Sequence, residues 1–246
     1  MQPMPRESQA DRKKRALRIH RKLERAYPDA DCALEYGSPF QLLIATILSA
    51  QCTDKMVNQV TRELFQHYPD AKAMAQAELG DLERLVKRTG FFRQKAKSLK
   101  NTSTDIVEKF GGEVPRTLEE LITLRGAARK TANVVLGNAF GIPGLTVDTH
   151  MKRINGRLGL TRHDDPVKIE RDLMALIPEK DWTWYSHRVI HHGRECCDAR
   201  KPQCERCPVR EECPWPGSAA ARAGGKVAIR KKPAGRTAAR KTGRRP

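Results

Sequence analysis

The sequence predicts an all-α fold. Apolar residues recur at helical spacing in several stretches, most clearly in residues 55–67, 129–140 and 165–177, and give each stretch one apolar face. No run of alternating apolar and polar residues is long enough to form a sheet. The length of 246 residues allows one large domain or two small ones, with a core that needs no disulfides.

Local capping signals predict where some of these helices begin and end. Asp165 followed by Pro166 is a typical N-cap and first-turn pair. A capping box over residues 117–120 predicts a short helix that ends near residue 124. Further helices are expected over residues 81–88 and 181–193.

The charge of the chain indicates a polyanionic partner. The net charge is +18, and residues 217–246 hold ten Lys or Arg and no acidic residue. This tail is poor in large apolar side chains, so we expect a disordered basic arm that adds non-specific affinity for phosphates. The alternative is a solubilising tail without a partner. Residues 1–17 are expected to form a basic, flexible N-terminal extension.

Neither a membrane span nor a secretory signal is visible. The longest apolar run, residues 40–50, is shorter than the ~18–20 residues that cross a bilayer. The first 15 residues are polar and lack the apolar region of a signal peptide. We therefore expect the chain to remain in the cytosol, without membrane contact.

Four of the seven cysteines are spaced as a metal-cluster loop. The pattern is Cys197-x6-Cys204-x2-Cys207-x5-Cys213. An odd number of cysteines in a cytosolic chain argues against a disulfide framework. Four thiolates suit zinc or a [4Fe–4S] cluster, and the long loops favour the larger cluster. The spacing leaves zinc as an alternative, and it leaves open whether Cys196 or Cys197 is the first ligand.

The loop between the first two ligands carries two adjacent cations, Arg200 and Lys201. A loop closed by a metal is rigid, which reduces the entropy lost when it binds a phosphate. We interpret these two residues as a phosphate-binding finger. The alternative is an ordinary solvated loop.

A second motif places a tight turn, residues 125–128, between the short helix and a helix that begins at Arg129. Such a helix pair aims backbone N–H groups at an anion and suits non-specific binding to the DNA backbone. Lys130 lies in the first turn, where the helix dipole and partial burial would favour a neutral, nucleophilic amine. Asp148 is either an N-cap or a carboxylate that faces Lys130 and stabilises positive charge on a sugar. From the residues alone, the default interpretation of Lys130 is a surface lysine that contacts phosphate.

Several motifs together resemble one protein family. They are Leu48-Ser49-Ala50-Gln51, the segment from Gly126 to Val135, Val147-Asp148-Thr149-His150 and the four-cysteine loop. The order and spacing of these motifs are similar to those of the endonuclease III family, the iron–sulfur branch of the helix-hairpin-helix DNA glycosylase superfamily. The resemblance covers residues of about 18 to 216.

The resemblance implies a two-domain helix-hairpin-helix DNA glycosylase fold with a [4Fe–4S] cluster loop. Residues 32–142 would form a six-helix domain that contains the hairpin. Residues 18–31 and 143–216 would form the iron–sulfur domain, and residues 217–246 would remain a disordered basic tail. DNA would lie across the cleft between the two domains.

The resemblance also implies roles for individual residues. Lys130 would attack C1′ of the deoxyribose, and Asp148 would offset the developing charge. Gln51 and Phe91 would fill the gap left by the flipped nucleotide. Ser49, Asp54 and His150 are candidate polar residues of the pocket. The cluster ligands would be Cys197, Cys204, Cys207 and Cys213, and further DNA contacts would come from Arg125, Gly126, Ala128, Arg129, Arg200 and Lys201.

The implied activity is that of a bifunctional DNA glycosylase and AP lyase of base excision repair. The enzyme would remove oxidised pyrimidines from double-stranded DNA and cleave the strand at the abasic site by β-elimination. We expect a monomeric, cytoplasmic, nucleoid-associated bacterial protein.

The hairpin departs from the family pattern. The family usually reads Leu-Pro-Gly-Val-Gly, whereas this chain reads Leu124-Arg125-Gly126-Ala127-Ala128. If the second glycine of the family has a positive φ, Ala128 carries steric strain that weakens DNA binding, while Arg125 adds a cation near the phosphate.

Three other functions compete with this interpretation. A catalytically silent protein that binds damaged DNA is consistent with the altered hairpin. An adenine-mismatch glycosylase of the same superfamily also carries a cluster, but it lacks the lysine nucleophile and has an additional C-terminal domain. A cluster-based redox sensor is the least favoured, because no other redox motif is present.

Overall fold

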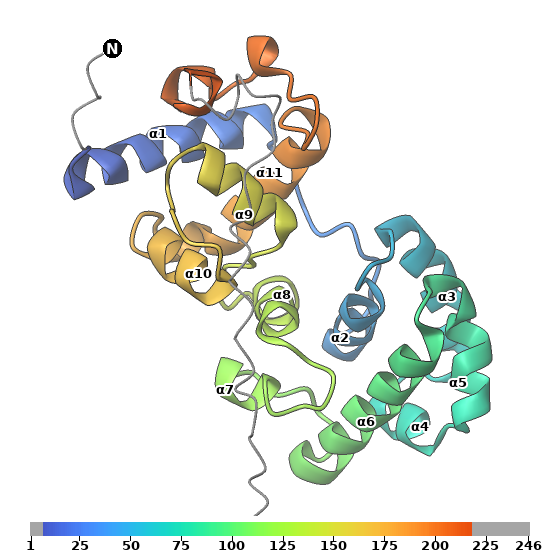
Figure 1. The fold of residues 1–246 in the computed structure, drawn as a ribbon. Coiled ribbons are helices and arrows are strands. Elements are labelled where there is room, and N and C mark those ends of the chain that lie inside the picture. Colours follow the sequence, from blue (N-terminus) through green and yellow to red (C-terminus); the bar gives the residue numbers. More distant parts are fainter. Residues whose placement is uncertain (1–6, 218–246) are drawn as a thin grey trace, which may run out of the picture.

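The computed structural model describes residues 7–217, and within this range the regular structure is helical throughout, with no β-strand (Figure 1). The expected all-α class is confirmed. The proposed basic tail and the first six residues lie outside the described residues. Within the same range, none of the helices is long and apolar enough to cross a membrane.

The α-helices are α1 (Gln9–Ala26), α2 (Pro39–Leu48), α3 (Asp54–His67), α4 (Ala71–Gln76), α5 (Leu79–Val86), α6 (Phe92–Phe110), α7 (Leu118–Leu121), α8 (Arg129–Ala139), α9 (Thr149–Arg157), α10 (Pro166–Met174) and α11 (Trp182–Glu195). Short 3-10 turns follow α5, precede α11 and shape the cysteine loop. Residues 32–142 thus hold seven α-helices, α2–α8, rather than the expected six. The shortest of them, α7, is a single turn of four residues.

The buried apolar residues form two separate clusters. The first runs from Leu34 to Leu136 and joins α2–α8. The second joins α1 to α9, α10 and α11, and so combines the beginning and the end of the described chain. Figure 1 shows the second group of helices on one side and α2–α6 on the other, with α8 between them. The chain therefore passes between the two groups twice, once after α1 and once after α8.

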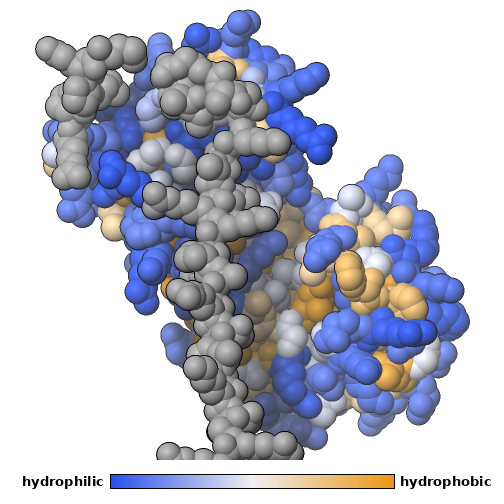
Figure 2. All heavy atoms as spheres, in the orientation of Figure 1, coloured by the Kyte–Doolittle hydropathy of each residue, from blue (hydrophilic) through white to orange (hydrophobic). Residues whose placement is uncertain are grey.

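Hydrophilic residues cover much of the visible surface on both sides, and a hollow separates the two groups of helices (Figure 2). Burial is most complete in α2, where eight of ten residues are buried. A helix that is apolar on all sides is a central core element. The residues of α2 therefore support the surrounding helices and the wall of the site.

The N-terminal extension is shorter than expected. Ser8 caps α1, which begins at Gln9, and Ala16 is fully buried. The guanidinium of Arg15 donates hydrogen bonds to the carbonyls of Leu158 (2.6 Å) and Glu212 (3.0 Å). The prediction of a flexible segment is therefore wrong for residues 9–17, whose helix packs on the cysteine-loop domain.

Candidate active site and metal-cluster loop

Lys130 and Asp148 line one cavity of about 110 Å³. The cavity is formed by the segment before α2, by α2 and α8, by residues 146–148 and by one face of α11. The two residues come from segments on either side of the junction between the hydrophobic clusters. The structure thus brings together the amine and the carboxylate that the sequence analysis paired.

Asp148 is held by its own helix. It is the N-cap of α9: Oδ1 accepts the backbone N–H of Met151 (2.8 Å), and Oδ2 lies 3.1 Å from Nδ1 of His150. Burial opposes ionisation of this carboxyl, but the hydrogen bonds from His150 and Met151 and the positive charges of His150 and Lys130 outweigh it. The pKa of Asp148 therefore lies below its ordinary value, and the capping role and the cavity-facing role coexist.

Lys130 is the second residue of α8, at the positive end of the helix dipole. It is exposed, so the partial burial expected from the sequence is not present in the DNA-free protein. The amine therefore has direct access from solvent and from a ligand that enters the cavity.

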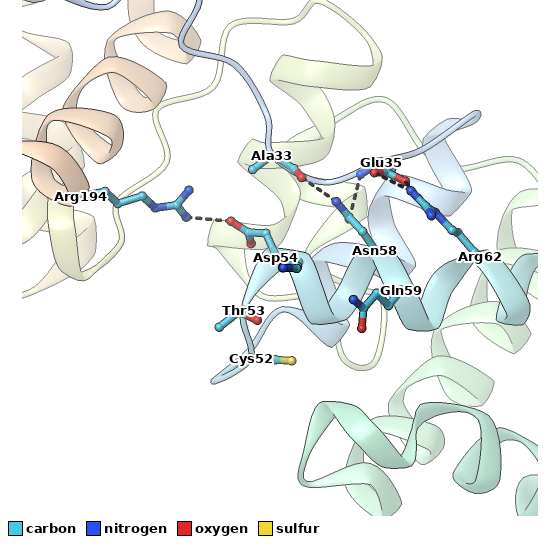
Figure 3. A pocket seen from close by; sticks show the side chains of 10 residues that line it. Ala33, Glu35, Cys52, Thr53, Asp54, Asn58, Gln59, Arg62 and Arg194 are labelled. Carbon is cyan, nitrogen blue, oxygen red and sulfur yellow. Dashed lines mark hydrogen bonds and ion pairs between the residues drawn. The ribbon is translucent and has the colours of Figure 1, made fainter.

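Of the remaining pocket candidates, Ser49 and Asp54 line this cavity, whereas His150 does not and contacts it only through Asp148. Asp54, at the start of α3, pairs with Arg194 of α11 at 2.8 Å. Ser49 also lines the cavity and donates its hydroxyl to the carbonyl of Thr46 (2.8 Å). Asp54 and Arg194 form part of a second, larger groove of about 720 Å³, which continues along α3 (Figure 3). The ion pair therefore borders both the Lys130 cavity and this groove.

Sequence reasoning missed the contribution of α11. His187, His191 and Arg194 all line the Lys130 cavity. Their spacing of four and three residues places them on one face of a helix, and this spacing was a signal that the sequence contained. Burial lowers the pKa of His187, whose Nε2 lies 2.7 Å from Oδ1 of Asn138.

Gln51 and Phe91, the two residues expected to fill the gap in the DNA, share an unusual backbone. Among residues 7–217, they are the two non-glycine residues with positive φ, at 53° and 48°. Gln51 is exposed, and Phe91 is 67 % exposed although it is a large apolar side chain. Left-handed backbone in such residues costs free energy and concentrates at functional sites. Both side chains are thus held outward at loop tips next to the beginning of a helix.

The hairpin needs glycine at its first position, and alanine is tolerated at its second. Gly126 has a φ of +102°, and a Cβ there would lie 3.0 Å from both Ser98 Cβ and Thr102 Oγ1. Ala128 has a φ of −90° and a ψ of 165°, which is ordinary extended backbone. The prediction of strain at Ala128 is therefore wrong: the left-handed residue of this turn is Gly126.

The cations expected to contact DNA fall into two groups. Arg125 pairs with Asp105, and Arg129 forms a bidentate pair with Glu170; both carboxylates are almost fully buried. Arg200 and Lys201, by contrast, are exposed and form no ion pair within the part of the chain that the structure describes. Their backbone N–H groups instead bind Oδ1 of Asp198, which shapes the loop tip. The two hairpin arginines therefore belong to the scaffold as well as to the surface.

Four thiols gather in the cysteine loop. Cys197, Cys204, Cys207 and Cys213 line one pocket, whose other walls include Ile154, Leu158, Val209 and Trp215. Cys196 does not line this pocket, and its thiol lies 3.6 Å from the carbonyl of Gln203. Burial raises the pKa of Cys207 to about 12 and that of Cys213 to about 11. An apolar pocket lined by four thiols suits a cluster whose iron atoms replace the thiol protons.

A buried arginine holds the first of these thiols. The guanidinium of Arg157 donates to Sγ of Cys197 (3.2 Å) and to the carbonyls of Asp198 (2.7 Å) and Ala199 (2.9 Å). It also stacks 4.4 Å above the ring of Trp215. These contacts favour Cys197 over Cys196 as a ligand.

A competing set of metal ligands overlaps with this loop. His192, Cys196 and Cys207 have ligand atoms that lie within 4.8 Å of one another. This set offers three ligands, and one of them, Cys207, also belongs to the four-thiol pocket. His192 is already held by the hydroxyl of Tyr27 at 2.9 Å. The four-thiol set therefore provides the more complete site.

Comparison with known proteins decides the family. Residues 44–179, more than half of the chain, match the HhH-GPD superfamily of base excision DNA repair proteins, and residues 197–215 match the iron–sulfur binding domain of endonuclease III. The Endonuclease III of Synechocystis sp. is 56% identical over 206 residues, which are 83% of this chain and 94% of that protein. The chain belongs to the endonuclease III family.

Solved structures agree with this assignment. A non-covalent Endonuclease III–DNA complex has a TM-score of 0.79 and 41% identity, and the match covers 82% of this chain and 95% of that one. A trapped Endonuclease III–DNA covalent intermediate, an estranged-adenine complex, has the same TM-score and identity, with coverage of 82% and 96%. The helix-hairpin-helix glycosylase fold expected from the sequence is confirmed.

The family assignment also decides between metals. The iron–sulfur domain match implies a [4Fe–4S] cluster in this endonuclease III family member, and the match begins at Cys197. Zinc, the alternative that the cysteine spacing left open, is therefore not the expected metal. The adenine-mismatch alternative is likewise replaced by the endonuclease III assignment.

The contacts of Asp148 generate a prediction about pH. In His150→Ala, the carboxylate loses a hydrogen bond and a positive neighbour, so its pKa rises and its ionised form is lost at a higher pH as the solution is acidified. The acid limb of the base-excision rate should therefore move to higher pH. Single-turnover excision measured from pH 3 to 8 checks this, with exposed His67→Ala as the control. An acid limb that stays in place would show that His150 does not control this carboxylate.

The four-thiol pocket generates a prediction about iron. Cys196→Ser should keep about four irons per chain and the brown colour, whereas Cys197→Ser should lose iron, because only Cys197 lines the pocket. Metal analysis and the visible absorption spectrum of both purified variants provide the measurement. Iron loss in Cys196→Ser with normal iron in Cys197→Ser would reverse the ligand assignment.

Proposed function

We propose that Lys130 and Asp148 carry out the two chemical steps of this enzyme. As a member of the endonuclease III family, the chain is a bifunctional DNA glycosylase and AP lyase of base excision repair that acts on oxidised pyrimidines. The observation that supports the assignment of residues is that an exposed amine and an ionised carboxylate, from two different helices, line one cavity. A silent binding protein has no need of this arrangement.

The first step removes the base. Once Lys130 has given up its ammonium proton, Nζ forms a bond to C1′ of the flipped nucleotide while the bond from C1′ to the base nitrogen breaks, and the base leaves with the electron pair and takes up a proton. The sugar gains positive charge as this bond breaks. The carboxylate of Asp148 stabilises that charge, and its hydrogen bonds to His150 and Met151 keep it ionised and in place.

The second step cleaves the strand. Loss of a proton from the lysine adduct and opening of the sugar give a Schiff base between Nζ of Lys130 and C1′. Removal of a C2′ proton then expels the 3′ phosphate by β-elimination, and water hydrolyses the Schiff base and releases Lys130. The amine is therefore regenerated.

The remaining site residues bind and orient the DNA in this proposal. Gln51 and Phe91 enter the gap left by the flipped nucleotide, where the amide pairs with the orphan base and the ring stacks. Ser49 and Asp54, which line the cavity, contact the lesion there, and His150 acts through its hydrogen bond to Asp148. The N–H groups of the hairpin and the side chains of Arg200 and Lys201 contact phosphates.

The iron–sulfur cluster would be held by Cys197, Cys204, Cys207 and Cys213 and would cross-link their loop through iron–thiolate bonds. Arg157 orients the first ligand through its hydrogen bond to Sγ of Cys197. The rigid loop then presents Arg200 and Lys201 from a fixed position.

The chain binds damaged DNA, as members of its family do. We infer that its ligands are duplexes with damaged pyrimidines or abasic sites, that it binds them as a monomer, and that it acts on the nucleoid in the bacterial cytoplasm. The described relatives are bacterial, and the two apolar clusters are each complete within one chain.

Borohydride trapping tests this assignment. The wild-type protein should form a covalent adduct with a duplex that contains one abasic site, and Lys130→Gln should form none while it retains affinity within about threefold, because binding is distributed over many phosphates. Exposed Lys168→Gln on α10 is the matched control and should trap like wild type. An adduct at the wild-type rate in Lys130→Gln would assign the nucleophile to another amine, and no adduct in wild type would favour the silent binding protein.

A further inference from the structure

One face of α6 supports the DNA-binding hairpin. Thr102 donates its hydroxyl to the carbonyl of Arg125 (2.6 Å), and Gly126 lies so close to Ser98 and Thr102 that a Cβ would reach 3.0 Å from each. Asp105, one turn further along α6, contacts Arg125 as well. Residues 98, 102 and 105 are spaced by four and three positions, so they share one helix face.

Asp105 makes the strongest of these contacts. Its Oδ2 accepts both the backbone N–H of Arg125 (2.8 Å) and its side-chain Nε–H (3.0 Å), and its Oδ1 accepts from the ammonium of Lys109 (2.9 Å). Only 2% of the Asp105 side chain is exposed. Burial opposes ionisation, but the hydrogen bonds from Arg125 and Lys109 outweigh it and hold the pKa of Asp105 well below its ordinary value. A buried carboxylate that accepts three charge-assisted hydrogen bonds from two residues is a rigid anchor.

Asp105 accepts the backbone N–H of Arg125, a donor that a proline at position 125 would not have. Proline, the usual residue at position 125 in the family, has no N–H and has a fixed φ. Arginine has a backbone N–H that needs an acceptor, and its φ is not fixed by a ring. The carboxylate of Asp105 accepts this N–H and so restrains the backbone at residue 125. The terminal nitrogens of the Arg125 guanidinium make no hydrogen bond within residues 7–217, and 54% of the side chain is exposed.

We propose that Asp105 is a positioning residue for DNA binding, which fixes the hairpin backbone through the N–H of Arg125 and directs the free end of its guanidinium toward a DNA phosphate. In this arrangement the Asp105–Arg125 pair replaces the hairpin proline. The proposal takes only the ligand, duplex DNA, from the proposed function and does not depend on which residue is the nucleophile.

A double-variant cycle tests the proposal. Asp105→Leu should weaken affinity for a duplex with a stable abasic-site analogue by about tenfold, or ~1.4 kcal/mol, because the hairpin N–H and guanidinium lose their acceptor. Asp105→Leu combined with Arg125→Pro should bind within about threefold of wild type in low salt, because neither donor then remains. Asp105→Asn should fall between wild type and Asp105→Leu, since its amide oxygen can still accept the N–H. Glu63→Gln, an exposed acid on α3, is the matched control.

Two further readouts separate positioning from general stability. Across a salt series, Arg125→Pro should flatten the dependence of log affinity on log salt by about 0.9, the value for one lost phosphate contact. The maximal trapping rate at saturating abasic duplex should change much less than the affinity in Asp105→Asn, and iron content should be unchanged. Wild-type trapping, measured in parallel, reports on the proposed function separately.

Either of two results would overturn the proposal. One is a loss of affinity in Asp105→Leu that is the same with arginine or proline at position 125. The other is wild-type affinity in both Asp105→Asn and Asp105→Leu. If Asp105→Leu does not fold, the affinity loss caused by Asp105→Asn is measured instead, with arginine and with proline at position 125. An equal loss in the two backgrounds would overturn the proposal.

Discussion

A buried carboxylate, Glu170, joins the two halves of the active site. Its oxygens accept Nε–H and a terminal N–H of Arg129 at 2.8 and 2.9 Å, and Oε1 lies 3.3 Å from Nδ2 of Asn133. The same amide of Asn133 donates to the carbonyl of Leu145 (3.0 Å), three residues before Asp148. These bonds connect the first turn of α8 to α10 and to the segment that ends at Asp148. Since Lys130 follows Arg129 directly, the position of this proposed nucleophile relative to Asp148 depends on this contact.

The close approach of neighbouring backbone reinforces the connection. A Cβ on Gly144 would lie 2.7 Å from the carbonyl oxygen of Asn133, and one on Gly137 would lie 2.5 Å from Oγ1 of Thr183. Both glycines are therefore required for α8 to pack against the cluster-bearing half of the molecule. Glu170 is almost fully buried whereas 40% of the Arg129 side chain is exposed, so loss of Arg129 would leave a buried carboxylate without its charged partner.

The residues proposed to face DNA are supported in the same way as this junction, by neighbours that hydrogen bonds hold in place. Three of the residues proposed to react with DNA or to contact it stand next to a residue that the scaffold holds by hydrogen bonds. Lys130 follows Arg129, Gly126 follows the anchored Arg125, and Arg200 follows the loop that Arg157 fixes. Gln51 and Phe91 are the exception, because their own left-handed backbone sets their direction. Rigid support of this kind lowers the entropy lost on binding DNA.

Local sequence rules predicted the parts of the structure that are themselves local. The N-caps at Thr117, Asp148 and Asp165 are present, because a capping bond joins residues three positions apart. Two helix ends were placed too late: α7 ends at Leu121 and α10 at Met174, where the chain turns while apolar residues continue into the core. The helix α2 had no periodicity to detect, because it is buried on nearly all sides.

The long-range contacts of the site were not accessible in this way. The pairs Asp105–Arg125, Arg129–Glu170 and Asp54–Arg194 join residues that are 20, 41 and 140 positions apart, and no spacing rule connects them. For that reason the sequence assigned Arg125 and Arg129 to DNA alone and missed their buried partners. The resemblance of whole motifs to the endonuclease III family, in contrast, located Lys130 and Asp148 in one site, because it carries three-dimensional information that single residues do not.

The claim that Glu170 aligns Lys130 with Asp148 is tested most directly by the rate of covalent adduct formation in Glu170→Gln. This substitution keeps the shape of the side chain and removes the charge that holds Arg129. Trapping at saturating abasic-site duplex should slow by at least about tenfold, or ~1.4 kcal/mol in the barrier, with iron content unchanged. Exposed Glu179→Gln should trap like wild type. A folded, iron-replete Glu170→Gln that traps at the wild-type rate would contradict the account.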